Sequence, residues 1–176
     1  MILERDFLKM PAYEAAPLML GKLLCRRKGT EIIRARITET ECYYGIDDSA
    51  SHAHRGMTER NSVMFGEGGR TYVYLCYGMH NLLNITTGVE GHPEAVLIRG
   101  VEGAQGPGRV TRLLGIDRQM NKLSVCDPEG DIWLEDDGYL PDVQLSKRVG
   151  IDYAQEKDRE RLWRFFDAKL AKAKYN

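Results

Sequence analysis

Residues 33–54 read IRARITETECYYGIDDSASHAH, and this stretch decides how the rest of the chain is interpreted. Apolar and polar side chains alternate over 33–37, a period of two that is typical of a half-buried strand. If the strand continues, Glu39, Glu41 and Tyr43 face the same side as the apolar set. An ionised carboxylate there is costly unless it is paired, hydrogen-bonded or at the wall of a wet pocket.

The strand is followed by a turn at Gly45 and a polar loop over 47–54 that carries two histidines. A carboxylate at the end of a strand, with aromatic residues and histidines after it, fits an active site. The same residues also fit exposed glutamates on a strand edge and solvated loop histidines. The stretch by itself leaves both interpretations open.

The composition indicates one soluble globular domain over residues 1–176, of 176 residues with 43% hydrophobic and 29% charged side chains. No apolar run has the length of a membrane span, and polar residues come too early for a secretory signal, so we expect a cytoplasmic protein. The four cysteines form no C-x-x-C pair, which argues against a zinc site or a disulfide framework.

The net charge of −1 argues against a strongly basic, non-specific nucleic-acid binder. It does not exclude a local basic face, because acidic residues gather over 127–142 while the middle of the chain is rich in arginine. These middle arginines are Arg55, Arg60, Arg70, Arg99, Arg109, Arg112 and Arg118. A face of this kind could contact phosphates.

A β-hairpin is the clearest element elsewhere in the chain, with strands at 71–77 and 81–87. Tyr77, Met79 and His80 fall at or near its tip. Large apolar residues are unusual there, because tips normally carry small polar residues. The tip therefore either folds Met79 back onto the core or serves as a wedge, and wedges of this kind can unstack a base step.

The remaining pattern predicts short elements joined by glycine-rich loops. We expect helices within 6–20 and over 107–114, the second beginning after Gly-Pro and ending at a glycine. Strands are expected over 23–27, 95–99 and 131–135, and the charged segment 154–175 is expected to be helical.

Several motifs, taken in order, resemble the alkyladenine (3-methyladenine) DNA glycosylases, in a compact bacterial-type form. They are TETECY (38–43), DSASH (48–52), YVYLCYGM (72–79), NI (84–85), Arg99, GPGR (106–109) and RVGI (148–151). The resemblance extends from about residue 6 to about residue 154. It departs from the family at the short 99–106 segment and at the C-terminus, where residues 163–166 match the final strand only loosely and a Lys/Ala-rich tail follows.

The resemblance implies an α+β fold, a single mixed domain with a curved, mainly antiparallel β-sheet, surrounding helices and a protruding β-hairpin. It implies a monofunctional DNA glycosylase of base-excision repair that acts as a monomer on double-stranded DNA containing a damaged purine. Such enzymes flip an alkylated or deaminated purine out of the duplex and hydrolyse its N-glycosidic bond, leaving an abasic site. No metal or organic cofactor is implied, no membrane partner is expected, and a bacterial member would be associated with the nucleoid.

The resemblance also implies roles for individual side chains. Glu41 matches the general base and Arg99 the arginine near the attacking water and the phosphate. The set matched to the base pocket is Tyr43, His52, Tyr74 and Asn84, with Asn84 crowding the exocyclic amine of normal guanine. At the hairpin tip Tyr77 matches the side chain that enters the minor groove, and Met79 lies beside it. DNA-backbone contacts are expected from Arg60 and Arg109.

Three alternatives remain at this point. Glu39 is a second candidate for the base, ranked below Glu41 because the motif match favours Glu41. A catalytically weak lesion-binding protein would keep the pocket without the chemistry. A metal-dependent hydrolase would use Glu41, His52 and His54. The sequence does not identify the preferred lesion or the acid that would protonate a neutral leaving base.

Overall fold

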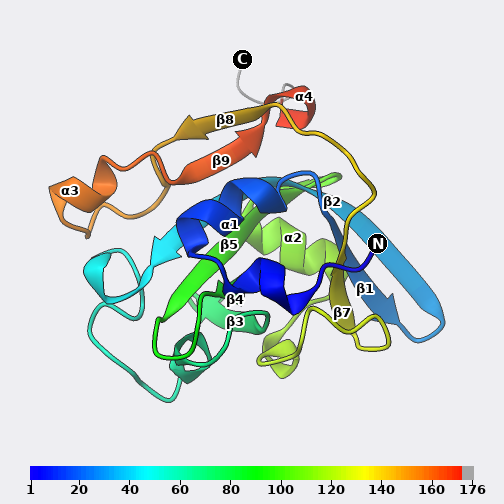
Figure 1. Ribbon diagram of the computed structural model, residues 1–176, viewed down its shortest axis with the longest axis horizontal. Coiled ribbons are helices and arrows are strands. Elements are labelled where there is room, and N and C mark those ends of the chain that lie inside the picture. The colour runs from blue at the N-terminus through cyan, green and yellow to red at the C-terminus, as the bar shows by residue number, and fades with distance from the viewer. Residues whose placement is uncertain (172–176) are drawn as a thin grey trace.

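A computed structural model describes residues 1–171 of the chain (Figure 1). In chain order the elements are η1 (Arg5–Lys9), α1 (Ala12–Met19), β1 (Leu23–Lys28), β2 (Glu31–Tyr44), η2 (Gly45–Asp47), η3 (Ser62–Phe65), β3 (Thr71–Cys76), β4 (His80–Thr87), β5 (Glu94–Val101), β6 (Ala104–Gln105), α2 (Pro107–Leu114), η4 (Arg118–Met120), β7 (Ile132–Glu135), β8 (Val143–Ser146), α3 (Glu156–Arg159), β9 (Arg164–Asp167) and α4 (Ala168–Ala171). Among these residues, no helix has the length and apolar character needed to cross a membrane.

The strands form a curled, antiparallel sheet, which confirms the expected α+β class. The main path runs β3-β4-β5-β2-β1-β7, while β6 pairs with β5, and β9 pairs with both β2 and β8. β2 is the organising strand because its first half pairs with β1 and its second half with β5 and β9. The long cyan-blue strand crossing Figure 1 shows how it joins the two parts of the sheet.

Side chains on the second half of β2 are buried on both faces, and they alternate as the sequence predicts. The Thr40 hydroxyl donates to the carbonyl of Ala16 in α1 at 2.8 Å. Glu39 and Glu41 lie on the other face, where both reach the guanidinium of Arg99 in β5. A strand covered on both faces must satisfy every polar group inside the protein, so the glutamates are committed to fixed partners.

The hairpin of β3 and β4 projects a bulky apolar tip. Cys76 pairs with His80, so residues 77–79 make the turn. Tyr77 and Gly78 both adopt positive φ, of 49° and 67°. Tyr77 is 87% exposed and Met79 is 73% exposed, so Met79 does not fold back onto the core. A tyrosine in the left-handed region costs about 1–2 kcal/mol in backbone energy, so the exposed turn holds local strain.

The prediction of a helix over 154–175 is wrong for the central part of this segment. Only α3 and α4 are helical there, and β9 lies between them, hydrogen-bonded to β2 and β8. The burial of β9 alternates, with Phe165 and Asp167 inside, because this strand completes the edge of β2. β8 was not expected from the sequence. The part of the expected helix over 172–175 lies outside the described residues.

Candidate active site

A cavity of about 450 Å³ opens between the β3–β4 hairpin, the end of β2 and the segment after β8. The side chains and backbone that line it are Tyr43, Ala50, His52, Arg60, Met64, Tyr72, Tyr74, Leu75, Cys76, Tyr77, Leu82, Asn84, Ala95, Leu97, Arg99, Val149, Gly150 and Tyr153. The wall is largely aromatic and aliphatic with a few polar groups, the usual character of a pocket for a small organic group.

Glu41 lies behind the cavity wall, and its side chain is fully buried. One carboxylate oxygen accepts a hydrogen bond from the Tyr43 hydroxyl at 2.9 Å. The other accepts from the backbone N–H of Val149 at 2.7 Å and lies 3.5 Å from Nε of Arg99. All three partner residues line the cavity, so a single layer of residues separates the carboxylate from it.

Burial raises the pKa of Glu41 above its usual value, opposed by the Arg99 charge and by the hydrogen bonds from Val149 and Tyr43. Burial disfavours the charged form, and the three donors favour it. A carboxylate with a raised pKa is a better proton acceptor than a solvated one, provided that it is ionised.

Glu39 is held in a different way from Glu41. One of its oxygens accepts hydrogen bonds from Nε of Arg99 at 3.0 Å and Nε of Arg164 at 2.5 Å. Glu39 does not line the cavity. Two guanidinium groups on one oxygen make Glu39 a counter-ion that orients Arg99, and Arg99 in turn faces both Glu41 and the cavity.

The aromatic side of the cavity is built by the loop after β2 and by β3. The His52 ring meets the rings of Tyr72 and Tyr74 edge-on, with centroids 5.9 Å and 4.6 Å apart. His52 Nδ1 lies 2.9 Å from the Tyr72 hydroxyl. Burial and the nearby Arg60 charge lower the pKa of His52 to about 4, so the imidazole is neutral at physiological pH.

Tyr72 was not singled out from the sequence. Its place two residues before Tyr74 in a β-strand puts both rings on one face, which is the signal that could have identified it. Asn84 is buried next to Tyr72. Its side-chain amide donates a hydrogen bond to the Tyr72 carbonyl at 3.2 Å.

A buried ion pair fixes the loop after β2 to the segment after β8, and sequence reasoning gave it no role. Arg148 makes two hydrogen bonds to Asp48, at 2.6 Å and 2.8 Å, and both side chains are fully buried. Arg148 also donates to the Cys42 carbonyl, and its guanidinium lies 4.9 Å from the Tyr43 ring. This pair positions Val149, whose N–H meets Glu41, one residue further along.

The structure does not gather the residues of the metal-hydrolase alternative. His54 Nδ1 lies 2.6 Å from the Ile46 carbonyl, whereas His52 faces Tyr72 and Glu41 faces Tyr43 and Val149. Within residues 1–171, no three His, Cys, Asp or Glu side chains are close enough to share a metal ion.

The two arginines expected at the DNA backbone lie at different places. The Arg60 guanidinium stacks 5.0 Å from the Tyr74 ring and lines the cavity. Arg109 is exposed in the first turn of α2. Arg60 shares the cavity lining with Tyr77 of the hairpin tip, whereas Arg109 does not line the cavity.

An aromatic pocket with a buried carboxylate behind it, next to an exposed wedge, fits the class of enzymes that act on a base taken out of the DNA stack. Family and relatives agree with this class. The family model for methylpurine-DNA glycosylase (MPG) matches residues 6–105 and 102–170. The chain belongs to the methylpurine-DNA glycosylase family, and it is a DNA glycosylase, a hydrolase of N-glycosyl bonds.

Curated relatives share most of the chain and bear the name "Putative 3-methyladenine DNA glycosylase". One from Methanocella arvoryzae is 41% identical, over 94% of this chain and 92% of its own. One from Borrelia garinii subsp. bavariensis is 40% identical, over 93% of this chain and 95% of its own. One from Clostridioides difficile is 34% identical, over 93% of this chain and 99% of its own. The family model reaches residue 170, within the C-terminal region where the sequence motifs are weakest.

Proposed function

We propose that this enzyme removes alkylated and deaminated purines, including 3-methyladenine, 7-methylguanine, hypoxanthine and ethenoadenine, with a water molecule activated by Glu41. The observation that carries the proposal is the buried Glu41 carboxylate behind an aromatic cavity, held by Tyr43, Val149 and Arg99. The enzyme acts as a monomer on double-stranded DNA.

Binding begins with removal of the damaged nucleotide from the duplex, which costs a few kcal/mol. Tyr77 fills the vacated space, supported by Met79, and this insertion offsets part of the cost. The base then lies against Tyr43, Tyr74 and His52, where aromatic stacking contributes about 1–3 kcal/mol per contact. A cationic alkylated purine gains further from the electron-rich ring faces.

Hydrolysis then proceeds by attack of water at C1′ of the flipped nucleotide. The water oxygen bonds to C1′ as the N-glycosidic bond breaks, the water proton passes to Glu41, and the bonding electrons leave with the purine. The Glu41 carboxylate also stabilises the positive charge that develops on the sugar. Its raised pKa favours proton acceptance, while the Arg99 charge and the hydrogen bonds from Val149 and Tyr43 oppose the rise by favouring the ionised form.

A cationic purine leaves without further assistance because its departure neutralises the ring. A neutral purine leaves with the bonding electrons and takes up a proton, so its departure gains no help from a positive ring charge. Asn84 would crowd the exocyclic amine of normal guanine, and its hydrogen bond to the Tyr72 carbonyl supports a fixed position. We expect this contact to slow excision of normal guanine, whereas hypoxanthine lacks the amine and 7-methylguanine compensates through its positively charged ring.

The direct test is base excision by wild type and Glu41→Gln. Duplex DNA with one hypoxanthine or ethenoadenine is incubated with each protein in EDTA, then heated in alkali to break abasic sites. We expect cleavage at the lesion by wild type and a rate about 10²–10⁴-fold lower for Glu41→Gln, the usual contribution of a general base. Exposed Glu90 supplies the matched control Glu90→Gln, which should retain the wild-type rate.

The outcomes separate the alternatives. Lesion binding without cleavage by wild type would favour the lesion-binding protein. Cleavage that persists in Glu41→Gln and disappears in Glu39→Gln would transfer the base to Glu39. Loss of wild-type activity in EDTA, restored by a divalent metal, would favour the metal-dependent hydrolase.

A further inference from the structure

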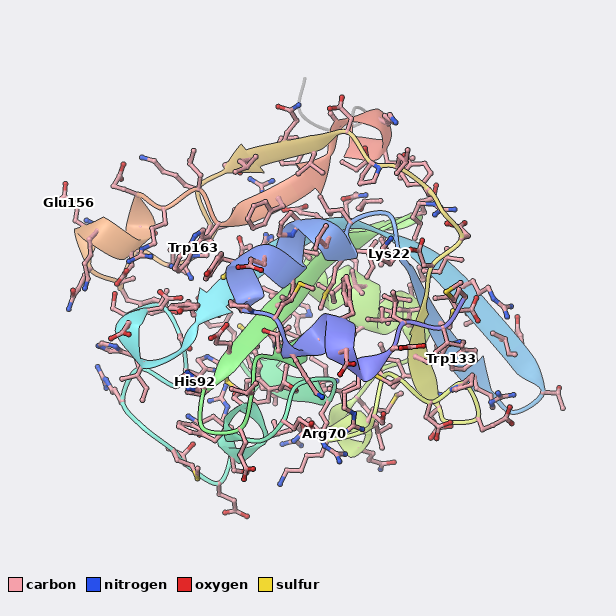
Figure 2. All side chains as sticks on the ribbon, in the orientation of Figure 1. Lys22, Arg70, His92, Trp133, Glu156 and Trp163 are labelled. Atoms are coloured by element: carbon pink, nitrogen blue, oxygen red, sulfur yellow. The ribbon has the colours of Figure 1, made fainter. Side chains whose placement is uncertain are left out.

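Arg164 of β9 reaches the acidic face of β2 from the neighbouring strand. Its register partner in β2 is Glu41, so these two side chains lie on the same face of the sheet. The Arg164 Nε donates to a Glu39 carboxylate oxygen at 2.5 Å. Figure 2 shows Trp163 where the chain enters β9, close to the end of β2, and the Trp163 carbonyl accepts the Cys42 N–H at 2.8 Å. Backbone pairing therefore holds Arg164 against β2.

The Arg164 guanidinium is held by β8 as well. Its Nη1 donates to the hydroxyl of Ser146 at 3.2 Å, and Ser146 is the register partner of Arg164 in this strand pair. Only 12% of the Arg164 side chain and 6% of the Glu39 side chain are exposed. A short ion pair that is shielded from water is stronger than a surface pair and is less screened by salt.

The Glu39 oxygen that accepts Arg164 also accepts Arg99. The Arg99 Nε lies 3.0 Å from this oxygen and 3.5 Å from a Glu41 oxygen, so the two carboxylates compete for one cation. Arg164 supplies Glu39 with a second cation, and two carboxylates then face two guanidinium groups. Without Arg164, the Glu39 charge would draw Arg99 away from Glu41.

The charge of Glu39 also acts on the ionisation of Glu41. The charged and titratable groups that face Glu41 are Glu39 and Tyr43 on β2, Arg99 on β5, Arg164 on β9 and Tyr153 after β8. Burial is the largest cause that raises the pKa of Glu41, and the Glu39 charge raises it further, whereas the Arg99 charge lowers it. Neutralising Glu39 therefore favours the ionised form of Glu41, which is the form that can accept a proton from water.

We propose that Arg164 is a positioning residue of the excision site. It neutralises Glu39, so that Arg99 stays shared with Glu41 and keeps facing the cavity. Arg164 and Glu39 are both outside the cavity lining, so we expect neither side chain to touch the flipped base. The inference rests on the proposed function, because it concerns the surroundings of the proposed general base.

The first measurement is the titration of Glu41 in the free protein, followed by carbon-13 NMR of the glutamate carboxyl groups. The Glu41 signal is assigned by its loss in Glu41→Gln. We expect the midpoint of this titration to rise by about 1 pH unit in Arg164→Gln, because a less compensated like charge then lies beside Glu41. The double variant Arg164→Gln/Glu39→Gln removes both charges of the pair and should return the midpoint to near the wild-type value.

The second measurement is single-turnover excision of hypoxanthine from a duplex over a series of pH values. We expect Arg164→Gln to excise about 10-fold more slowly at its optimum, because Arg99 is displaced. The low-pH limb of its profile should move up with the Glu41 midpoint, since this limb reports the general base. Fluorescence anisotropy should give a wild-type affinity for the same duplex, because Arg164 is outside the cavity.

Arg36→Gln is the matched control. Arg36 lies on β2, its side chain is 16% exposed, and it pairs with Asp137 away from the cavity. We expect this variant to keep the wild-type titration and pH profile. A Glu41 midpoint that is unchanged in Arg164→Gln, or that moves equally in Arg36→Gln, overturns the inference.

Arg164→Lys keeps the inference testable if Arg164→Gln does not fold. Lysine retains the positive charge beside Glu39, so the Glu41 midpoint should stay at the wild-type value. A raised midpoint in Arg164→Lys would show that charge is not the cause and would also overturn the inference.

The titration of Glu41 is measured without DNA, which separates this inference from the proposed function. If wild type excises no lesion, the proposed function fails, while the titration still decides the role of Arg164. A low-pH limb that stays in place in Arg164→Gln although the Glu41 midpoint has moved would count against Glu41 as the base.

Discussion

Replacement of Arg148 by methionine is the sharpest test of how the loop around the cavity is held. The substitution keeps an unbranched apolar side chain but removes the guanidinium that bonds Asp48 twice and the Cys42 carbonyl once. Asp48 would keep only the backbone N–H groups of Tyr44 and Ala50, at 3.0 Å and 3.1 Å. A buried charge left without its partner costs about 3–5 kcal/mol, a large part of the roughly 5–15 kcal/mol that stabilises a domain.

Urea unfolding, followed by tryptophan fluorescence, measures this loss. Trp163 is a local reporter because the Arg148 guanidinium lies 5.2 Å from its ring. With a slope of about 2 kcal/mol per molar urea, the midpoint should fall by roughly 2 M. Lys147→Met is the matched control, since the Lys147–Glu160 pair is more than half exposed and contributes about 0–1 kcal/mol.

A double-mutant cycle with Asp48→Asn tests the cause of the loss. If unpaired charge is the cause, Arg148→Met/Asp48→Asn should cost less than the sum of the single variants, by about 1–3 kcal/mol. Simple addition of the two losses, or a loss below about 1 kcal/mol for Arg148→Met, would refute the reasoning.

Two further predictions concern the hairpin tip and the histidine of the cavity. Tyr77→Ser should change the free energy of unfolding by less than about 0.5 kcal/mol, because the side chain is 87% exposed. The same substitution should slow excision from duplex DNA more than from single-stranded DNA. Equal slowing on both substrates would count against a wedge. For His52 the folded pKa of about 4 lies below the ordinary 6.5, so the unfolded chain binds a proton first and the protein loses stability as pH falls from about 6.5 to 4. Thermal unfolding of His52→Gln across this window should show a shallower loss than wild type, and parallel curves would disprove a neutral, buried imidazole.

Local sequence predicted the elements whose signals are contained in a few neighbouring residues. α2 has the bounds that the Gly-Pro start and glycine stop predicted, Pro107–Leu114. The alternation of β2 placed Glu41 and Tyr43 on one face, where they are hydrogen-bonded. The aromatic, β-branched run of β3 predicted the hairpin, whereas the exposure of Met79 at its tip was left open and came from the structure. Backbone periodicity and turn chemistry act over short distances, so they can be recognised without the fold.

Only the tertiary structure decided the contacts that join distant segments. β9 is a strand because it completes the edge of β2, although the charge-rich segment around it predicted a helix. Glu39 and Glu41 have the same local pattern. Distant partners distinguish them, because Arg164 contacts Glu39 whereas the Val149 N–H bonds Glu41 behind the cavity. Such pairings depend on which surfaces meet when the chain folds, and no local periodicity encodes them.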